Sequence, residues 1–331
     1  MNLMKLTRRA VIAAVASAAT VAALPAFSQA FPSRPIKIIV AFAPGGSSDT
    51  LSRLYGQKMS EILNTPVIIE NRPGANQVTA IRALMASPPD GYTLYAATGS
   101  ALTQNPALRK DLPYDPLKDF SYIGMAATNP GVIFVSNDLP VHSLPELFAY
   151  AKANPGKLNY GSAGLGTAGH LAAEALMSAG NFKMTHIPYK NDAEVIRETM
   201  SGSVHLGIFT TLNTVQPIKA GRIRGISVTT PKRLSYLPEV PGLSESKLGG
   251  LEAMDPHTFA AFVGPAGMPQ DVVAKLNDAI NKASQSPDVA ARVRETLNAE
   301  PVTSTPASFR QSVEKQLALW RELGKTVKLS E

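Results

Sequence analysis

The most informative stretch of the chain is NYGSAGLGTAGHLAAEAL, residues 159–176. A strand is expected over 158–161, and a helix is expected from about Ala168 to Ala179. Between them lies a G-x-G-x-x-G loop made by Gly164, Gly166 and Gly169. A strand, a glycine loop and a helix in this order predict an α/β unit whose loop presents backbone N–H groups at a helix N-terminus.

The same glycine spacing occurs in dinucleotide-binding loops, which also need an acidic residue about twenty positions further on. The nearest candidate is Asp192, but Pro188 and Tyr189 already end the preceding strand, and Asp192 is better placed to cap the next helix. No Lys-Ser/Thr pair follows the loop, as a nucleoside triphosphate site would require. The sequence therefore argues against a nucleotide, and we expect no cofactor.

Catalytic and metal sites are also not expected. The serine elbow Gly-x-Ser-x-Gly fails around Ser162, because Tyr160 stands at the first glycine position. The chain has no cysteine, which excludes disulfides and thiolate chemistry. Besides His170, four histidines have no metal-ligand spacing, and most of them are expected on the surface or as satisfied core residues: His142, His186, His205 and His257.

The first thirty residues have the features of an export signal. Arg8 and Arg9 belong to a basic start, residues 10–24 form an apolar stretch too short for a comfortable membrane span, and small residues at 28–30 suit a signal peptidase. Cleavage is expected before Phe31, which predicts a periplasmic protein. An uncleaved anchor is the alternative, and the choice between general and twin-arginine export stays open.

The net charge of +7 overstates the basicity of the mature chain. The leader holds three of the 32 Lys and Arg residues and none of the 25 Asp and Glu residues, which leaves 29 basic against 25 acidic residues, or +4. This excess is scattered and is not interleaved with aromatic residues, so no nucleic-acid partner is expected. A mild positive field would favour the arrival of a small anion.

Beyond the leader, strands and helices alternate. Strands are expected at 36–42, 67–70, 92–97, 131–136, 158–161, 184–188, 204–209, 224–228 and within 258–269. Helices are expected over the apolar face of 51–63, at 78–86, after the capping box of Ser143 and Glu146, and at 168–179, 270–284, 288–298 and 306–325. This alternation is typical of α/β folds with mostly parallel sheets.

The strand pattern restarts near residue 130 and gives way to helices after residue 260. We therefore expect two lobes crossed twice by the chain, one made of 31–130 and 256–331 and the other of 131–255. The connecting strands are expected near 126–135 and 255–264. A single long sheet is the alternative.

Each expected lobe holds a glycine-rich turn between a strand and a helix, AFAPGGSSD (41–49) and GSAGLGTAGH (161–170). Such turns bind anions through backbone N–H groups and the helix dipole, and glycine lets a ligand approach the backbone closely. Nearby hydroxyls could add donors. Two turns facing each other across a cleft would hold a carboxylate. The alternative is that both are tight turns merely capped by Ser or Thr.

Several ordered blocks carry a resemblance to a known family: PIKIIVAFAPGGSSDTLSRLYGQKMSEIL, VIIENRPGA, PPDGYTL, NYGSAGLGTAGHLAAE, HIPYK, IKAGRIRGISVTTPKR, LPEVPGL and FVGPAGMPQDVVAKLN. From end to end the chain resembles the extracytoplasmic solute receptors of the Bug, or tripartite tricarboxylate transporter, type. The resemblance implies a two-lobed periplasmic-binding-protein fold (Venus flytrap, type II) with a double chain crossover. It also implies a non-catalytic monomer that delivers a small carboxylate to membrane transporter subunits.

The resemblance places the ligand between the two glycine loops, held through backbone groups and bridging waters. The residues it assigns to the ligand site are Phe42, Ala43, Gly46, Asp49, Ser162, Gly164, Gly166, Thr167 and His170. We also expect Ser47, whose hydroxyl can donate from the first turn, and Thr210 at the site. An exported enzyme or a sensory receptor acting on a small carboxylate remains the alternative.

The chain departs from the family pattern at three places. Asn76 and Gln77 follow NRPGA where further glycines are usual, and Phe259 replaces a common tryptophan before the P-A-G-x-P turn. The G-x-V-D-x-x-F-D pattern has lost both acids, which are replaced by His205 and Thr210. The loss at Thr210 argues against an amino-acid ligand, whose ammonium group would need that acid.

Overall fold

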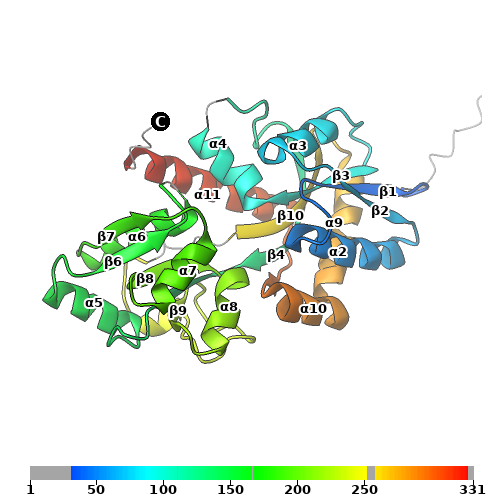
Figure 1. Cartoon of the computed structure of the whole chain (residues 1–331). Helices are drawn as coiled ribbons and strands as arrows, with labels where there is room; N and C mark the ends of the chain where they lie inside the picture. Colours follow the sequence, from blue (N-terminus) through cyan, green and yellow to red (C-terminus); the bar gives the residue numbers. More distant parts are fainter. Residues whose placement is uncertain (1–30, 110, 166, 252–257, 327–331) are drawn as a thin grey trace, which may run out of the picture. The chain divides into compact units, whose positions relative to one another are not determined.

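The computed structural model describes residues 31–109, 111–165, 167–251 and 258–326 (Figure 1). The described residues from Arg34 onward belong to one compact unit. The expected signal peptide over residues 1–30, with its cleavage site, lies outside the described residues. None of the described helices is both long and apolar enough to cross a bilayer.

The first sheet has six strands in the order β11-β4-β10-β3-β1-β2. The strand β1 pairs in parallel with β2 and β3, whereas β10 runs antiparallel to both β3 and β4. The bounds are β1 (Ile36–Val40), β2 (Val67–Asn71), β3 (Thr93–Thr98), β4 (Phe120–Asn129), β10 (Thr258–Pro265) and β11 (Glu300–Pro301).

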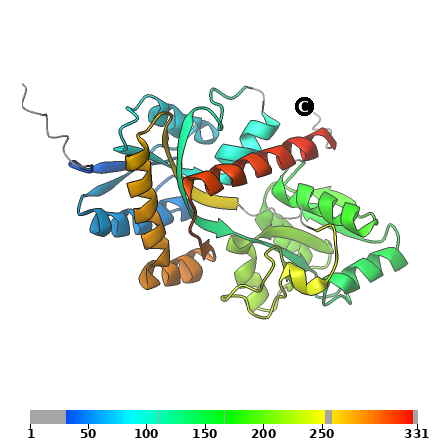
Figure 2. The ribbon, with the colours of Figure 1, turned by 180° about the vertical axis from the view of Figure 1, so that it is seen from behind.

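Helices cover both faces of this sheet. On one face α2 (Ser47–Leu63), α9 (Gln270–Gln285) and α10 (Pro287–Leu297) pack against one another, as Figure 2 shows from behind for α9 and α10. On the other face α3 (Val78–Met85) and α11 (Pro306–Thr326) share one apolar cluster with Ile39. Short helices η1 (Ala75–Gln77), η2 (Ser100–Gln104) and α4 (Asn105–Leu108) connect the elements.

The second sheet has five strands in the order β7-β6-β8-β5-β9, in which β5 runs antiparallel to β8 and β9. Its strands are β5 (Gly131–Val135), β6 (Asn159–Ser162), β7 (Thr185–Pro188), β8 (Leu206–Thr210) and β9 (Arg224–Val228). Its helices are α5 (Leu144–Ala153), α6 (Ala168–Gly180), α7 (Asp192–Met200) and α8 (Thr211–Lys219), and a short η3 (Leu243–Ser246) follows β9.

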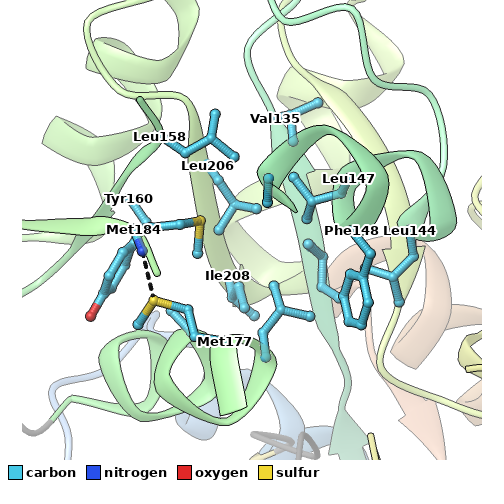
Figure 3. Packing of buried hydrophobic residues seen from close by; sticks show 14 of the residues in the cluster. Val135, Leu144, Leu147, Phe148, Leu158, Tyr160, Met177, Met184, Leu206 and Ile208 are labelled. Carbon is cyan, nitrogen blue, oxygen red and sulfur yellow. Dashed lines mark hydrogen bonds between the residues drawn. The ribbon is translucent and has the colours of Figure 1, made fainter. Parts of the chain in front are cut away.

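The strand β5 shows how this sheet is held between two cores. Ile133 and Val135 face the cluster of α5 and α6, whereas Val132 and Phe134 face the cluster of α7 and α8. Successive side chains of a strand point to opposite faces, so a strand buried on both faces is apolar throughout. Figure 3 shows the first of these cores, with Met177 accepting a 3.0 Å hydrogen bond at its sulfur from the backbone N–H of Met184.

Both sheets have the same internal order. Apart from the edge strand β11, the first sheet reads β2-β1-β3-β10-β4 and the second reads β7-β6-β8-β5-β9. In each sheet the strand in which the chain arrives from the other sheet, β10 or β5, lies between the third and fourth strands and runs antiparallel to both. This is a two-lobed α/β fold of type II with a double crossover, so the expected architecture is confirmed and a single long sheet is excluded. The first sheet takes its strands from 36–129 and 258–301, the second from 131–228.

Most expected elements agree with the structure to within one or two residues, but two expectations differ. The helix α7 is capped by Asn191 and not by Asp192, because the Asn191 side chain accepts a hydrogen bond from the Glu194 backbone N–H (2.9 Å). Asp192 is the first helical residue and accepts from Asn213 instead (2.8 Å). The connecting strand expected near 126–135 includes only the last residues of the long strand β4, which begins at Phe120.

Candidate ligand-binding site

A cavity of about 250 Å³ lies at the carboxyl ends of the strands β1, β3 and β8. Ligands of open α/β sheets bind at this edge, where the loops leave the parallel strands. Its described lining residues are Ser47, Ser48, Leu51, Thr98, Ser100, Ala127, Asn129, Thr210, Leu212, Thr258, Phe259, Ala260, Leu297 and Ala299. None of these described lining residues carries a charge, so polar recognition there depends on hydroxyls, amides and backbone groups.

The first glycine loop is organised by the carboxylate of Asp49, which is only 2% exposed. Its Oδ2 accepts from the Gly45 N–H (2.8 Å) and from Arg53 Nε (2.9 Å), and its Oδ1 accepts from Asn71 Nδ2 (2.8 Å). Burial alone would raise the pKa of Asp49, but the hydrogen bonds from Arg53, Gly45 and Asn71 hold it below its usual value. Asp49 is therefore ionised, and its carboxylate holds the loop in shape through these hydrogen bonds.

The helix α2 begins immediately after this loop without a side-chain cap. Its N-cap is Gly46, and Ser47 and Ser48 occupy the first turn. The first N–H groups of a helix have no intrahelical partner, and together with the helix dipole they attract anions. The alternative that a Ser side chain simply caps this turn is wrong.

The helix α8 brings a second such N-terminus to the same cavity. Its N-cap Thr210 makes no side-chain capping hydrogen bond, and both Thr210 and Leu212 line the cavity. The helices α5 and α7 differ, because Ser143 and Asn191 cap them with their side chains. Among the described residues that line the cavity, two uncapped helix N-termini therefore meet, one from each sheet, α2 and α8.

The second glycine loop is closed by its own hydroxyl groups. Ser162 Oγ is fully buried and donates to the Gly164 carbonyl (2.9 Å), which also accepts from Thr167 Oγ1 (2.8 Å). Gly164 has a φ of +116°, a conformation that favours glycine. The N-cap of α6, Thr167, makes no side-chain cap. Gly166 lies outside the described residues.

Two histidines pack together beneath this loop. His170 and His186 have ring centroids 4.4 Å apart, and His186 Nε2 lies 2.7 Å from Ser162 Oγ. Burial and the neighbouring His170 lower the pKa of His186 to about 4, and burial also lowers the pKa of His170. Tyr160 stacks on His186 and donates to Glu174 (2.7 Å). Within the described part of the chain no group of three His, Asp or Glu side chains could hold a metal ion.

Of the site residues expected from the sequence, Ser47 and Thr210 meet at the cavity. Phe42, Ala43 and Gly46 lie exposed in the first loop. The other expected residues that the structure describes do not line this cavity. Asp49 is buried in the first loop, and four lie in the second loop: Ser162, Gly164, Thr167 and His170.

Sequence reasoning missed the polar residues that follow β3 and flank the crossover strands. Thr98 ends the third strand of the first sheet as Thr210 ends the third strand of the second, and Ser100 follows two residues after Thr98. Asn129 ends β4 and Thr258 begins β10. A search for polar residues directly after each strand would have found Thr98 and Ser100, whereas the other two depend on the crossover.

The chain is similar to known proteins over most of its length. The family described as tripartite tricarboxylate transporter family receptor matches residues 51–329. A UPF0065 protein of Bordetella pertussis is 37% identical over 277 residues, covering 81% of this chain and 83% of the relative. Protein BugT of the same species is 30% identical over 330 residues, covering 98% and 100%.

Solved structures agree as well. The structure of R. palustris Rpa4515 with adipate is 31% identical with a TM-score of 0.69, covering 89% of this chain and 98% of that one. MatC from Rhodopseudomonas palustris with bound malate is 27% identical with a TM-score of 0.64, covering 89% and 100%. The family match spans most of the chain, and the two-lobed fold agrees with it. This chain therefore belongs to the tripartite tricarboxylate transporter receptor family, among the Bug-type solute receptors, which are binding proteins and not enzymes.

Proposed function

We propose that the chain is a periplasmic receptor that captures a small carboxylate and delivers it to a membrane transporter of the tripartite tricarboxylate type. The observation that carries the proposal is the pair of uncapped helix N-termini, α2 and α8, at one cavity of about 250 Å³. Backbone N–H groups at two helix ends supply partial positive charge to an anion without any charged side chain.

The cavity chemistry supports a carboxylate over a sugar or nucleotide. Its described lining combines hydroxyls and one amide, such as Ser47, Thr98 and Asn129, with the apolar surface of Leu51 and Phe259. Its volume is below the usual range of ligand pockets, which is ~300–1,000 Å³, so the ligand is small. The adipate and malate in the two solved structures are also small carboxylates.

In this proposal both glycine loops act on the ligand, one from each lobe, in a monomer whose lobes comprise 31–130 with 256–331 and 131–255. Exposed loop residues offer backbone groups, whereas Asp49, Ser162 and His170 act by shaping the loops, because they are buried. Residues 1–30 are proposed to direct export to the periplasm.

The test is thermal unfolding and calorimetric titration of the mature protein against a panel of aliphatic and aromatic mono- and dicarboxylates, sugars and nucleotides. A bound carboxylate at a hundred times its Kd should stabilise the fold by about 2.7 kcal/mol. Sugars and nucleotides should leave the melting temperature unchanged. A response to nucleotides with none to any carboxylate would refute the proposal.

Matched variants at the start of α8 test the helix ends. Thr210→Asp and Thr210→Asn are both good N-caps, so both should fold. Thr210→Asp places a negative charge at the cavity and should weaken carboxylate binding at least about tenfold, or ~1.4 kcal/mol, while Thr210→Asn stays within about threefold. Gly166→Asp tests the second loop in the same way. If all these variants bind the carboxylate as tightly as the wild type, neither the helix ends nor the second loop belongs to the ligand site.

A further inference from the structure

Behind the polar wall of the cavity lies a buried side chain that does not itself line it. Gln77 is 4% exposed, and its Nε2 donates to Ser100 Oγ (2.8 Å). Its Oε1 accepts from Tyr95 OH (2.8 Å) and from Thr98 Oγ1 (3.0 Å). Thr98 and Ser100 both line the cavity. Gln77 therefore joins the interior of the first sheet to two residues whose hydroxyls belong to the cavity lining.

The backbone that carries Gln77 adopts an unfavourable conformation. Ala75, Asn76 and Gln77 have φ values of 45°, 48° and 76°, so three successive non-glycine residues lie in the left-handed region. Side chains there clash with the backbone, and such strain persists where the surroundings over-determine it, often at functional sites. Glycine would adopt these angles freely. The strain points to a role for a side chain in this turn, and of these three only Gln77 is buried.

The hydrogen atoms of the network can be assigned one by one. Tyr95 and Thr98 each donate their hydroxyl hydrogen to Gln77 Oε1, which fills both of its acceptor sites. Ser100 Oγ accepts from the Gln77 amide, so its own hydrogen remains to be donated. Within the described residues it can be donated to Thr98 Oγ1, 2.9 Å away. An acceptor in the cavity can take that hydrogen instead.

We propose that Gln77 is a specificity-determining positioning residue, which holds Ser100 as a hydrogen-bond donor toward the cavity. This inference rests on the proposed function and deepens it: the far end of the carboxylate ligand carries an acceptor oxygen, as in a second carboxylate, and not an ammonium group. An ammonium group has donors only and cannot accept the hydrogen that the Ser100 hydroxyl offers. Gln77 acts through Ser100 and does not touch the ligand.

The probes are three ligands of equal length that differ at the far end: adipate, hexanoate and 6-aminohexanoate, with succinate, butyrate and 4-aminobutyrate as the shorter set. In the wild-type protein the dicarboxylate should bind about tenfold or more tightly than the monocarboxylate, and the amino acid should bind most weakly. In Ser100→Ala and in Gln77→Met, which removes the amide at similar volume, that preference should fall to about twofold, because the dicarboxylate should lose more affinity than the monocarboxylate.

Two further variants separate specificity from stability. The double variant Gln77→Met/Ser100→Ala should lose no more of the preference than either single variant, because both changes act on the Ser100 donor, one by freeing its orientation and the other by removing it. Asn76→Gly changes the neighbouring strained residue and keeps Gln77, so it should retain the full preference. Circular dichroism and the melting temperature of every variant confirm that it is folded.

Each outcome decides one of the two claims. Equal weakening of all three ligands in Gln77→Met would show a merely structural side chain and overturn the inference. So would a wild-type protein that binds the amino acid as tightly as the dicarboxylate, or binds monocarboxylates alone. If no carboxylate of any kind binds the wild-type protein, the proposed function fails instead.

Discussion

At the scale of single residues, the buried polar side chains around the site hold loops in shape. Asp49 joins the first glycine loop to Arg53 and to Asn71 at the end of β2, and Asn71 Nδ2 also donates to the Phe42 carbonyl (2.9 Å). Three donors converge on one carboxylate, an arrangement in which charge-assisted hydrogen bonds are strong. The loop conformation therefore depends on the negative charge of Asp49.

Replacing this carboxylate with an amide tests that dependence. In Asp49→Asn the amide would meet donors on every side, so we expect a loss of about 1–3 kcal/mol in the free energy of unfolding. Carboxylate affinity should fall at least tenfold because the N-terminus of α2 shifts. Urea unfolding and calorimetric titration measure the two effects.

The matched control is Asp278→Asn on α9, which alters an exposed carboxylate that pairs with Lys282. Exposed pairs contribute little, so stability should change by less than about 0.5 kcal/mol and binding should not change. Similar behaviour of the two variants would contradict the role assigned to Asp49.

At the scale of elements, the second loop rests on a pair of neutral imidazoles between β7 and α6. His186 has a lowered pKa of about 4, so it is neutral at pH 7 and bonds with Ser162 at the end of β6. Above about pH 6.5 it is neutral in both the folded and the unfolded chain. As the pH falls, the unfolded chain binds the proton first, so the folded state loses stability between about pH 6.5 and pH 4.

This linkage predicts a difference between the wild type and His186→Gln. The glutamine keeps a polar atom near Ser162 but does not titrate. Between pH 7 and pH 4.5 the wild type should lose about 1–2 kcal/mol more than the variant, a value reduced for the partial exposure of His186. Denaturant unfolding at a series of pH values measures this. His142→Gln, at an exposed histidine, is the control, and parallel pH curves for wild type and His186→Gln would refute the linkage.

At the scale of the whole molecule, two sheets of identical order place equivalent loops at one site. The chain crosses from β4 to β5 at Pro130 and returns in β10. The Asn298 carbonyl, just after α10, accepts hydrogen bonds from Thr211 Oγ1 (2.5 Å) and Tyr236 OH (2.9 Å). These bonds tie the helix end of one lobe to residues of the other beside Leu297 and Ala299, which line the cavity.

Export is the further property of the whole chain that can be tested directly. We expect the periplasmic form to begin Phe31-Pro32-Ser33-Arg34, as read by N-terminal sequencing, because small residues precede the cleavage site. In Ala30→Tyr the bulky side chain should block cleavage and leave a longer, membrane-retained form. A wild-type chain that keeps its first thirty residues would contradict the expected leader.

Local sequence predicted the helices well, because their signals are local. The expected helix over 270–284 is α9 at Gln270–Gln285, and that over 306–325 is α11 at Pro306–Thr326. Amphipathic periodicity and terminal residues such as Pro306 suffice there. The strand β4 lacks such periodicity, and its partner β10 comes more than 120 residues later, so its length follows from pairing that no local window contains.

The sequence by itself determined the α/β class, the two glycine loops and the family, since these depend on local patterns and on the order of motifs along the chain. Only the tertiary structure decided which side chains share the cavity. Thr98 and Ser100 meet Thr210 because the chain crosses between two sheets of the same order. It also decided that Asp49 and Ser162 are buried and bonded within their loops, and that Gln77 lies behind Ser100. Burial and contact arise from packing between distant segments, which residue spacing does not encode.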